Sequence, residues 1–249
     1  MKNEFLGYFP PSEATLKTMW KEGVFAFDAN FLLNFYRYSK ETRIEIFRMV
    51  TGIRDRIWVG HQAALEFLRS RLGVIAEQEK TYDDAKKDLK RIEEEFKAPR
   101  RHPFVSDGLL KQMSALFAKL DKELEERKSE FTKLGESDAI QEELVKILEG
   151  KVGSPYPEKR LNEIFQEGEK RYKEKTPPGF KDQSKEGEKR KYGDLILWFQ
   201  LIDKAAADKK PIIFVTDDAK EDWWWKQPNN KTIGPRPELV AEIPPFLSS

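Results

Sequence analysis

The chain contains no cysteine and only two histidines among its 249 residues. The lack of cysteine excludes disulfide bonds, zinc–thiolate sites and thiol catalysis, and two histidines are too few for a histidine-rich metal site. The sequence has no long uncharged apolar stretch, and its first residues, MKNEFLGYFPPSEATLK, are too polar for a secretory signal. We therefore expect a soluble, cytoplasmic protein without a membrane span.

Charged residues make up 36% of the chain and hydrophobic residues only 39%. This balance argues against one compact core over the whole length, so we expect part of the chain to form a solvated helical projection. The net charge of +1 predicts no strong overall attraction to nucleic acid. A local group of lysine and arginine residues could still supply phosphate contacts, so the net charge neither supports nor excludes a nucleic-acid substrate.

Both ends of the chain carry the pattern of an α/β domain. Val24–Phe27 and Arg56–Val59 read as buried strands on either side of the amphipathic helix KETRIEIFRMV. A strand–helix–strand unit favours a parallel pair with a right-handed crossover. The helical pattern of Tyr192–Ala207 and the strand IIFV then repeat the arrangement near the end of the chain.

The middle of the chain has a helical period instead. Apolar side chains recur every seven residues from Leu68 to Phe96, prolines interrupt the pattern between Pro99 and Pro103, and a second pattern runs from Leu109 to Leu124. These features predict an antiparallel, coiled-coil-like helical hairpin, followed by helices near 137–148 and 157–172. We expect a discontinuous α/β domain formed by residues 1–75 and 180–249, with residues 76–179 as a helical insertion.

Four acidic motifs accompany these elements. Asp28 follows the first strand, Asp217 and Asp218 follow the strand IIFV, and Glu66 and Asp194 lie on helical patterns. The carboxyl ends of parallel strands face the crevice in which open α/β sheets bind ligands. Several carboxylates in one crevice repel each other unless cations neutralise them, and Mg²⁺ prefers oxygen ligands and commonly acts on phosphates.

Each acid also has a structural explanation when it is taken alone. Asp28 would cap a turn, and Thr216 and Asp217 would cap a helix over KEDWWW. Glu66 would be a solvated surface residue, and Asp194 would be a carboxylate at a helix N-terminus, where the helix dipole stabilises it. The functional interpretation depends on the acids as a group.

Further candidates lie beside these motifs. The basic stretch of residues 181–191, which contains Lys185, leads directly into Asp194, and it is either a solvated loop or an edge that follows a phosphate backbone. Asp182 in PPGFKD is a candidate for an additional metal ligand or for an acid that supports the metal ligands. Lys220 and Arg236 are candidate phosphate contacts.

The order of these motifs resembles the PIN nuclease fold: D-x-N after a first strand, a helical Glu, G-D opening a helix, and T-D-D after a late strand. More closely, the chain resembles the bacterial PIN-like family with a long helical insertion. The stretches that carry the similarity, between about residues 7 and 243, are FDANFLLNFYRYS, PPGFKD, KYGDLILWFQLIDKA, PIIFVTDDAKEDWW and GPRPEL. The resemblance implies a three-layer α/β fold with a central, mostly parallel sheet.

The resemblance also implies a nuclease, usually acting on RNA, that uses Mg²⁺ or Mn²⁺. The positions that match the family's metal ligands are Asp28, Glu66, Asp194 and one or both of Asp217 and Asp218, and the common T-x-D pattern points to Asp218. Asn30 matches the residue that positions the first acid, and Thr216 matches the hydroxyl that supports the site. The implied products carry a 5′-phosphate and a 3′-hydroxyl.

Several hypotheses of function remain open from the sequence. The first is an endoribonuclease of toxin or antiviral-defence type. A structure-specific DNA nuclease and a catalytically silent assembly module are the alternatives, and the helical insertion is a candidate surface for a second copy or a regulatory partner. A haloacid-dehalogenase-like phosphatase would need a second Asp where Asn30 stands.

Overall fold

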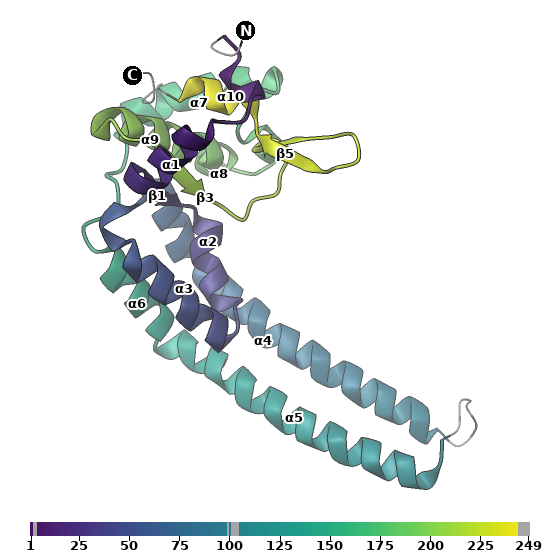
Figure 1. Cartoon of the computed structure of the whole chain (residues 1–249). Helices are drawn as coiled ribbons and strands as arrows, with labels where there is room; N and C mark the ends of the chain where they lie inside the picture. Colours follow the sequence, from purple (N-terminus) through teal and green to yellow (C-terminus); the bar gives the residue numbers. More distant parts are fainter. Residues whose placement is uncertain (2–3, 99, 101–104, 244–249) are drawn as a thin grey trace. The chain divides into compact units, whose positions relative to one another are not determined.

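The computed structural model describes residues 1, 4–98, 100 and 105–243 (Figure 1). The strands are β1 (Val24–Phe27), β2 (Ile57–Val59), β3 (Ile212–Val215), β4 (Trp224–Lys226) and β5 (Thr232–Pro235). The α-helices are α1 (Glu13–Glu22), α2 (Ala29–Leu33), α3 (Lys40–Gly52), α4 (His61–Lys97), α5 (Asp107–Glu136), α6 (Ala139–Leu148), α7 (Glu158–Lys173), α8 (Glu188–Lys191), α9 (Gly193–Asp208) and α10 (Pro237–Glu242). Short 3₁₀ turns are η1 (Leu6–Tyr8), η2 (Asn34–Tyr36), η3 (Arg54–Arg56) and η4 (Phe180–Asp182).

The central sheet has three parallel strands in the order β2-β1-β3. Every residue of β1 is buried, as expected for an apolar strand with neighbours on both edges. Phe27, the last residue of β1, pairs with Val215, the last residue of β3. The next residues of both strands, Asp28 and Thr216, therefore emerge side by side at the carboxyl edge of the sheet. The predicted α/β fold with a parallel sheet and a long helical segment is confirmed.

The described chain divides into two compact units. The first unit comprises residues 1–32, 44–68 and 147–249, and it contains the sheet together with α1, α7, α8, α9 and α10. The second unit comprises residues 33–43 and 69–146 and is helical. None of the helices in the described ranges is both long enough and apolar enough to cross a membrane.

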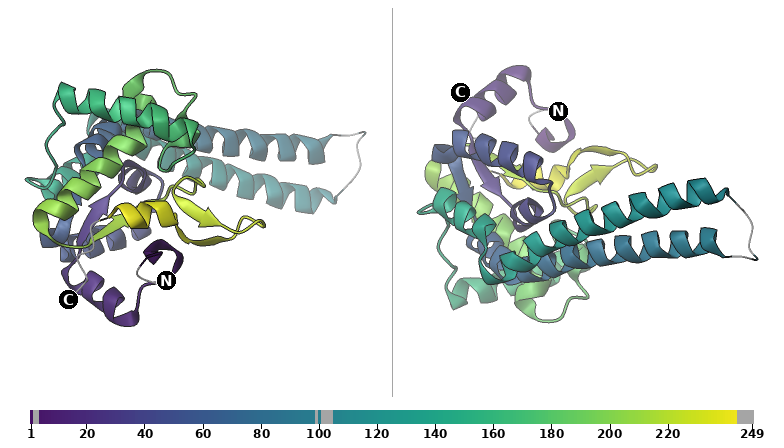
Figure 2. Two further views of the ribbon diagram at one scale, coloured as in Figure 1. Left: turned by 90° about the horizontal axis from the view of Figure 1, so that it is seen from above. Right: turned by 90° about the horizontal axis from the view of Figure 1, so that it is seen from below.

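The second unit is built around a helical hairpin in which α4, from residue 69 onward, runs beside α5 (Figures 1 and 2). The rings of Tyr82 and Phe131 meet across the two helices with centroids 5.7 Å apart. The ion pair of Lys128 with Asp83, 2.7 Å, also joins the helices. Most of the predicted proline break between α4 and α5 lies outside the described residues.

A buried polar cluster holds together the other end of the second unit. Asp138, which is almost completely buried, accepts hydrogen bonds from the Tyr36 hydroxyl at 2.7 Å and from Arg71 Nη1 at 2.9 Å. Because a buried carboxylate needs compensation for its lost hydration, these two donors are what makes the position of Asp138 tolerable.

The expected helix over KEDWWW is wrong. This segment forms a turn followed by β4, which pairs antiparallel with β5. Adjacent aromatic residues favour extended backbone, in which alternate side chains face opposite sides. Trp223 is buried against Phe214 of β3 and Trp198 of α9, with ring centroids 5.1 and 6.1 Å away.

Candidate active site

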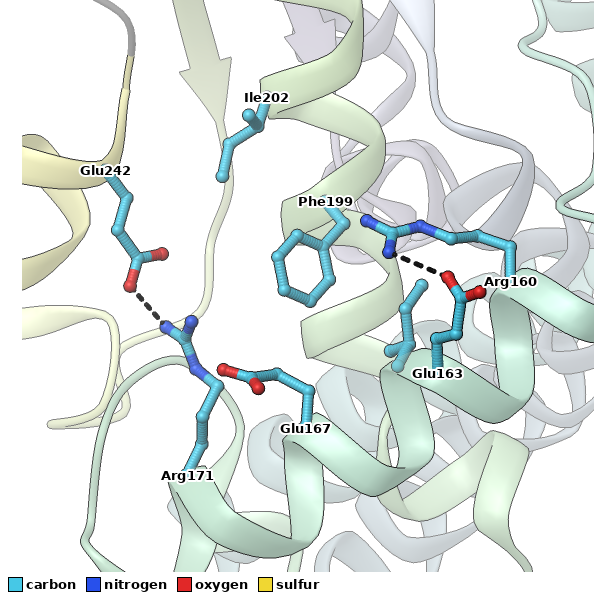
Figure 3. Close-up of a pocket in the computed structure, with 8 residues that line it drawn as sticks. Arg160, Glu163, Glu167, Arg171, Phe199, Ile202 and Glu242 are labelled. Carbon is cyan, nitrogen blue, oxygen red and sulfur yellow. Dashed lines mark hydrogen bonds and ion pairs between the residues drawn. The ribbon is translucent and has the colours of Figure 1, made fainter.

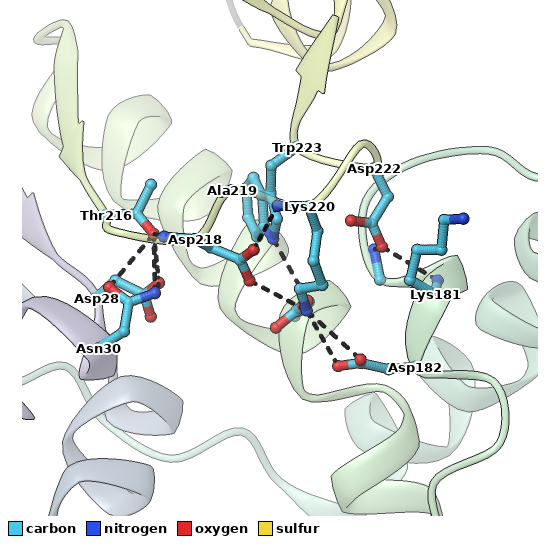
Figure 4. A network of polar contacts seen from close by, with 12 residues as sticks. Asp28, Asn30, Lys181, Asp182, Thr216, Asp218, Ala219, Lys220, Asp222 and Trp223 are labelled. Carbon is cyan, nitrogen blue, oxygen red and sulfur yellow. Dashed lines mark hydrogen bonds and ion pairs between the residues drawn. The ribbon is translucent and has the colours of Figure 1, made fainter. Parts of the chain in front are cut away.

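Asp28 stands at the carboxyl edge of the sheet, where a network joins the ends of β1 and β3 (Figure 4). Its Oδ2 accepts hydrogen bonds from Asn30 Nδ2 at 2.8 Å and Thr216 Oγ1 at 2.7 Å, and its Oδ1 accepts one from the Ala29 amide at 2.7 Å. Asn30 Oδ1 also accepts a hydrogen bond from the amide of Asp217 at 2.8 Å. The two strand ends are thus tied together around one carboxylate.

The environment of Asp28 favours its protonated form. Burial raises the pKa of Asp28 to about 7, although the hydrogen bond from Thr216 acts in the opposite direction. The negative charges of Asp194 and Glu66 also contribute to this raised value. These acids are therefore close enough to interact electrostatically in the metal-free protein.

Three aspartates from three separate segments converge on the ammonium group of Lys220 (Figure 4). Asp182 belongs to η4, Asp194 to the first turn of α9, and Asp218 to the loop after β3. Their oxygens lie 3.4, 2.8 and 3.1 Å from Lys220 Nζ, respectively.

The charges of this cluster act on each other strongly. Burial raises the pKa of Asp194, and Lys220 partly opposes that effect. Burial by itself would lower the pKa of Lys220, but Asp194 and Asp218 hold it well above its ordinary value. The Lys220 side chain is therefore a cation that the surrounding carboxylates hold in its charged form.

The two acids of the T-D-D motif differ in their exposure to solvent. Asp217 is exposed, whereas Asp218 is half-buried and contacts Lys220. The amide of Asp218 donates to Thr216 Oγ1 at 3.0 Å, which directs the chain into the cluster. Asp218 therefore belongs to the group of acids around Lys220.

Glu66 reaches the same region from the first turns of α4. The residue is exposed, yet desolvation around its carboxyl group raises the pKa of Glu66, and the charge of Asp194 raises it further. Lys185 and Lys220 act on it in the opposite sense. Glu66 therefore interacts electrostatically with Asp194 and Lys220 of the cluster.

The two other predicted basic residues occupy different positions. Lys185 Nζ lies 2.6 Å from Asp182 Oδ2, so it borders the acidic cluster. Arg236 pairs elsewhere: its Nε donates to the Glu221 carbonyl oxygen at 2.9 Å, and its Nη1 lies 3.8 Å from Glu238.

Asp222, which the sequence patterns did not point to, holds two segments of this region together. It is completely buried, and its Oδ2 accepts hydrogen bonds from the amides of Gly179 and Lys181, both at 3.1 Å (Figure 4). These bonds fix the loop that carries Asp182 to the segment that carries Lys220. The sequence offers one indication of this role: Asp222 directly precedes three tryptophans, and an unpaired carboxylate buried beside them would be costly.

Gly179 allows that loop to approach α9 closely. Its φ of +88° lies in the left-handed region, which glycine adopts without steric cost. A Cβ atom at this position would stand 2.4 Å from Tyr172 Oη and 3.1 Å from Asp194 Cβ. Glycine is therefore required both by the backbone conformation and by the space beside Asp194.

A separate pocket of about 500 Å³ lies between α7, α9 and α10 (Figure 3). Its charged side chains are largely paired with each other, for example Arg160 with Glu163 at 3.3 Å and Arg171 with Glu242 at 2.8 Å. Arg171 also donates to the Pro177 carbonyl oxygen, which helps to hold the loop before Gly179. Through Arg171, the wall of this pocket is therefore connected to the loop that leads to Asp182.

The donors of the acidic cluster are carboxylate oxygens, the type of ligand that a hard cation such as Mg²⁺ prefers. Among the residues that the structure describes, no group of three His, Asp or Glu side chains already stands at metal-binding spacing. The carboxylate oxygens around the ammonium group of Lys220 lie 2.8–3.4 Å from it, whereas Mg²⁺ binds oxygen at about 2.1 Å. The carboxylates already converge on one positive charge, and a smaller ion needs them to move inward.

Comparison with known families decides the identity of the fold. A family described as "PIN like domain" matches residues 24–239. The chain belongs to the PIN-like domain family. No curated protein and no solved structure matches it significantly. PIN-like domains fall generally within a nuclease superfamily, and the matched range includes both strand ends, α9 and the loop that carries Lys220.

Proposed function

We propose that this PIN-like domain is a metal-dependent endonuclease, and most specifically an endoribonuclease of toxin or antiviral-defence type. The observation that carries the proposal is the convergence of Asp182, Asp194 and Asp218 on one positive charge, beside the Asp28 strand end. Carboxylates gathered in this way have the chemistry of a Mg²⁺ or Mn²⁺ site that acts on phosphate.

The proposed ligands are Asp28, Glu66, Asp194 and Asp218, with Asp182 as a further acid at the edge of the site. A bound divalent ion supplies Lewis-acid activation of the phosphodiester and a bound water of lowered pKa. Asn30 and Thr216 hold the Asp28 carboxylate in place through their hydrogen bonds. We propose Asp218 rather than Asp217 as the acid of the T-D-D motif, because Asp218 faces the cluster and Asp217 faces solvent.

RNA is the proposed substrate, and the cytosol the proposed place of action. The stretch of residues 181–191 supports a polyanionic substrate, since it places Lys185 directly beside Asp182. DNA is the alternative, and a substrate panel separates the two. We also propose that the helical hairpin contacts another protein chain, either a second copy or a regulatory partner. Leu109 and Leu116 support this, because both remain more than half exposed on α5.

The deciding experiment is cleavage of labelled single-stranded RNA, transfer RNA and DNA with Mn²⁺, Mg²⁺ or a chelator. Asp28→Asn and Asp194→Asn are expected to abolish cleavage. Asp208→Asn is the matched control, because it removes an ion-paired carboxylate from the far end of the same helix, α9. Equal cleavage by all variants would identify a contaminating nuclease and refute the proposed site. Cleavage by none, including the wild type, would favour an assembly module.

A further inference from the structure

The ammonium group of Lys220 lies at the point where three aspartates converge. An ammonium group can donate three hydrogen bonds and cannot accept any. Four carboxylate oxygens, two from Asp182 and one each from Asp194 and Asp218, lie within 3.4 Å of Nζ. The group is thus surrounded in the manner of a bound ion rather than joined in an ordinary surface pair.

The ammonium group also offsets the repulsion among the acids. Five carboxyl groups interact electrostatically in this region, those of Asp28, Glu66, Asp182, Asp194 and Asp218. The cations that face them are Lys220 and Lys185, and Lys185 contacts Asp182 from the more exposed side. Removing Lys220 would leave three carboxylates around an empty centre, which is unfavourable without another cation.

We propose that Lys220 is an internal counter-cation, which holds the position of the divalent cation in the metal-free protein and leaves that position when a divalent cation binds. This inference rests on the proposed metal-dependent function. The two cations need the same oxygen atoms, and the carboxylates cannot satisfy an ammonium group at about 3 Å and Mg²⁺ at about 2.1 Å at once. The ammonium group and a divalent cation bound to the same carboxylates would also repel each other strongly, because both are positively charged.

The local structure allows Lys220 to leave by side-chain rotation alone. The residue lies between β3 and β4 outside any helix or strand, and 31% of its side chain is exposed. Its backbone amide donates to Oδ1 of Asp218 at 2.8 Å, so the main chain keeps a hydrogen bond to this acid when the ammonium group moves away from Oδ2. The long flexible stem of a lysine can then carry the charge out of the cluster, where it remains available to a substrate phosphate.

Direct binding of Mn²⁺, followed by electron paramagnetic resonance of the free ion, tests the competition. If the ammonium group is absent from the cluster for about a tenth of the time, the apparent affinity of the wild type is reduced about tenfold. Lys220→Met is therefore expected to bind Mn²⁺ about tenfold more tightly and, without metal, to melt at a lower temperature that Mn²⁺ restores. Lys185→Met is the matched control, because it removes one positive charge beside Asp182 and leaves Lys220 in place.

Equal gains in the two variants would show a general charge effect and overturn the proposal. Unchanged or weaker binding by Lys220→Met, with binding lost in Asp194→Asn, would show that the ion binds beside the lysine; the counter-cation role would then fail while the metal site stands. Absence of Mn²⁺ binding by both the wild type and Lys220→Met would overturn the proposal as well. Failure of the nuclease function is recognised separately, by the cleavage panel.

Amine labelling of the wild type provides a test that needs no variant. An activated ester, read out by mass spectrometry, is expected to modify Lys220 several-fold faster with Mn²⁺ than with chelator. Lys204 is the internal control, since its ion pair with Asp208 lies away from the cluster. Unchanged or slower labelling of Lys220 with Mn²⁺ would mean that the ammonium group stays in the cluster, and would refute its displacement.

Discussion

The raised pKa of Asp28 predicts that the metal-free protein loses stability as the pH rises. The unfolded chain releases the Asp28 proton near its ordinary pKa of 3.8, whereas the folded protein keeps it up to about pH 7. Between these values the folded state binds more protons than the unfolded state, so the free energy of unfolding falls with increasing pH. The contribution is complete below pH 3.8 and is lost by the time the pH has passed about 7.

The magnitude follows from the width of that interval. Each pH unit is worth about 1.4 kcal/mol when one group differs by one proton between the two states. The whole interval has a limit of about 4 kcal/mol, and the accessible window between pH 5 and pH 7 a limit of about 3 kcal/mol. Asp194 and Glu66, whose pKa values are also raised, act in the same direction.

Urea unfolding in the presence of a chelator measures this effect. All six tryptophans, at positions 20, 58, 198 and 223–225, belong to the first unit, so their fluorescence reports on the unit that contains Asp28. Asp28→Asn is the decisive comparison, because an amide does not titrate and its altered hydrogen bonds change the free energy by a constant. The difference between wild type and variant should therefore depend on pH. A wild-type stability that is level or rises from pH 5 to pH 7, or an equal slope in the variant, would refute the reasoning.

Two further predictions concern buried carboxylates. Asp222→Ala leaves the amides of Gly179 and Lys181 without an acceptor. We therefore expect the free energy of unfolding in urea to fall by about 2–4 kcal/mol and the cleavage rate to decrease. Asp222→Asn keeps an acceptor oxygen and should retain most of the stability and most of the cleavage rate. Equal effects of the two substitutions would contradict the positioning role. Asp138→Ala removes the shared acceptor of Tyr36 and Arg71 in the second unit, and we expect about 3–5 kcal/mol of destabilisation, measured by circular dichroism because this unit has no tryptophan. Asp84→Ala, which breaks an exposed pair, is its control at about 0–1 kcal/mol, and a similar loss in both would count against the buried cluster.

The local patterns were sufficient to predict the three strands of the central sheet, β1, β2 and β3, and the long helices α4, α5 and α9. An apolar run ending in an acid marked β1, and a seven-residue period marked the length of α4, because burial and helix packing impose those periods directly on the sequence. The segment KEDWWW was misassigned because it is short, and its pairing with β5 depends on a partner strand rather than on its own residues. The predicted limits of the insertion, at residues 76 and 179, stay a prediction.

The sequence by itself determined which acids were available, since Asp28, Glu66, Asp194 and the T-D-D motif can be identified from their places beside strands and helices. Only the tertiary structure decided which side chains meet. It turned Asp218 toward the cluster and Asp217 to solvent, and it placed Lys220 at the centre. The hydrogen bonds that Asp222 accepts from Gly179 and Lys181 also fix the loop that carries Asp182. The direction of a loop side chain depends on hydrogen bonds between residues far apart in the chain, and no local period encodes those bonds.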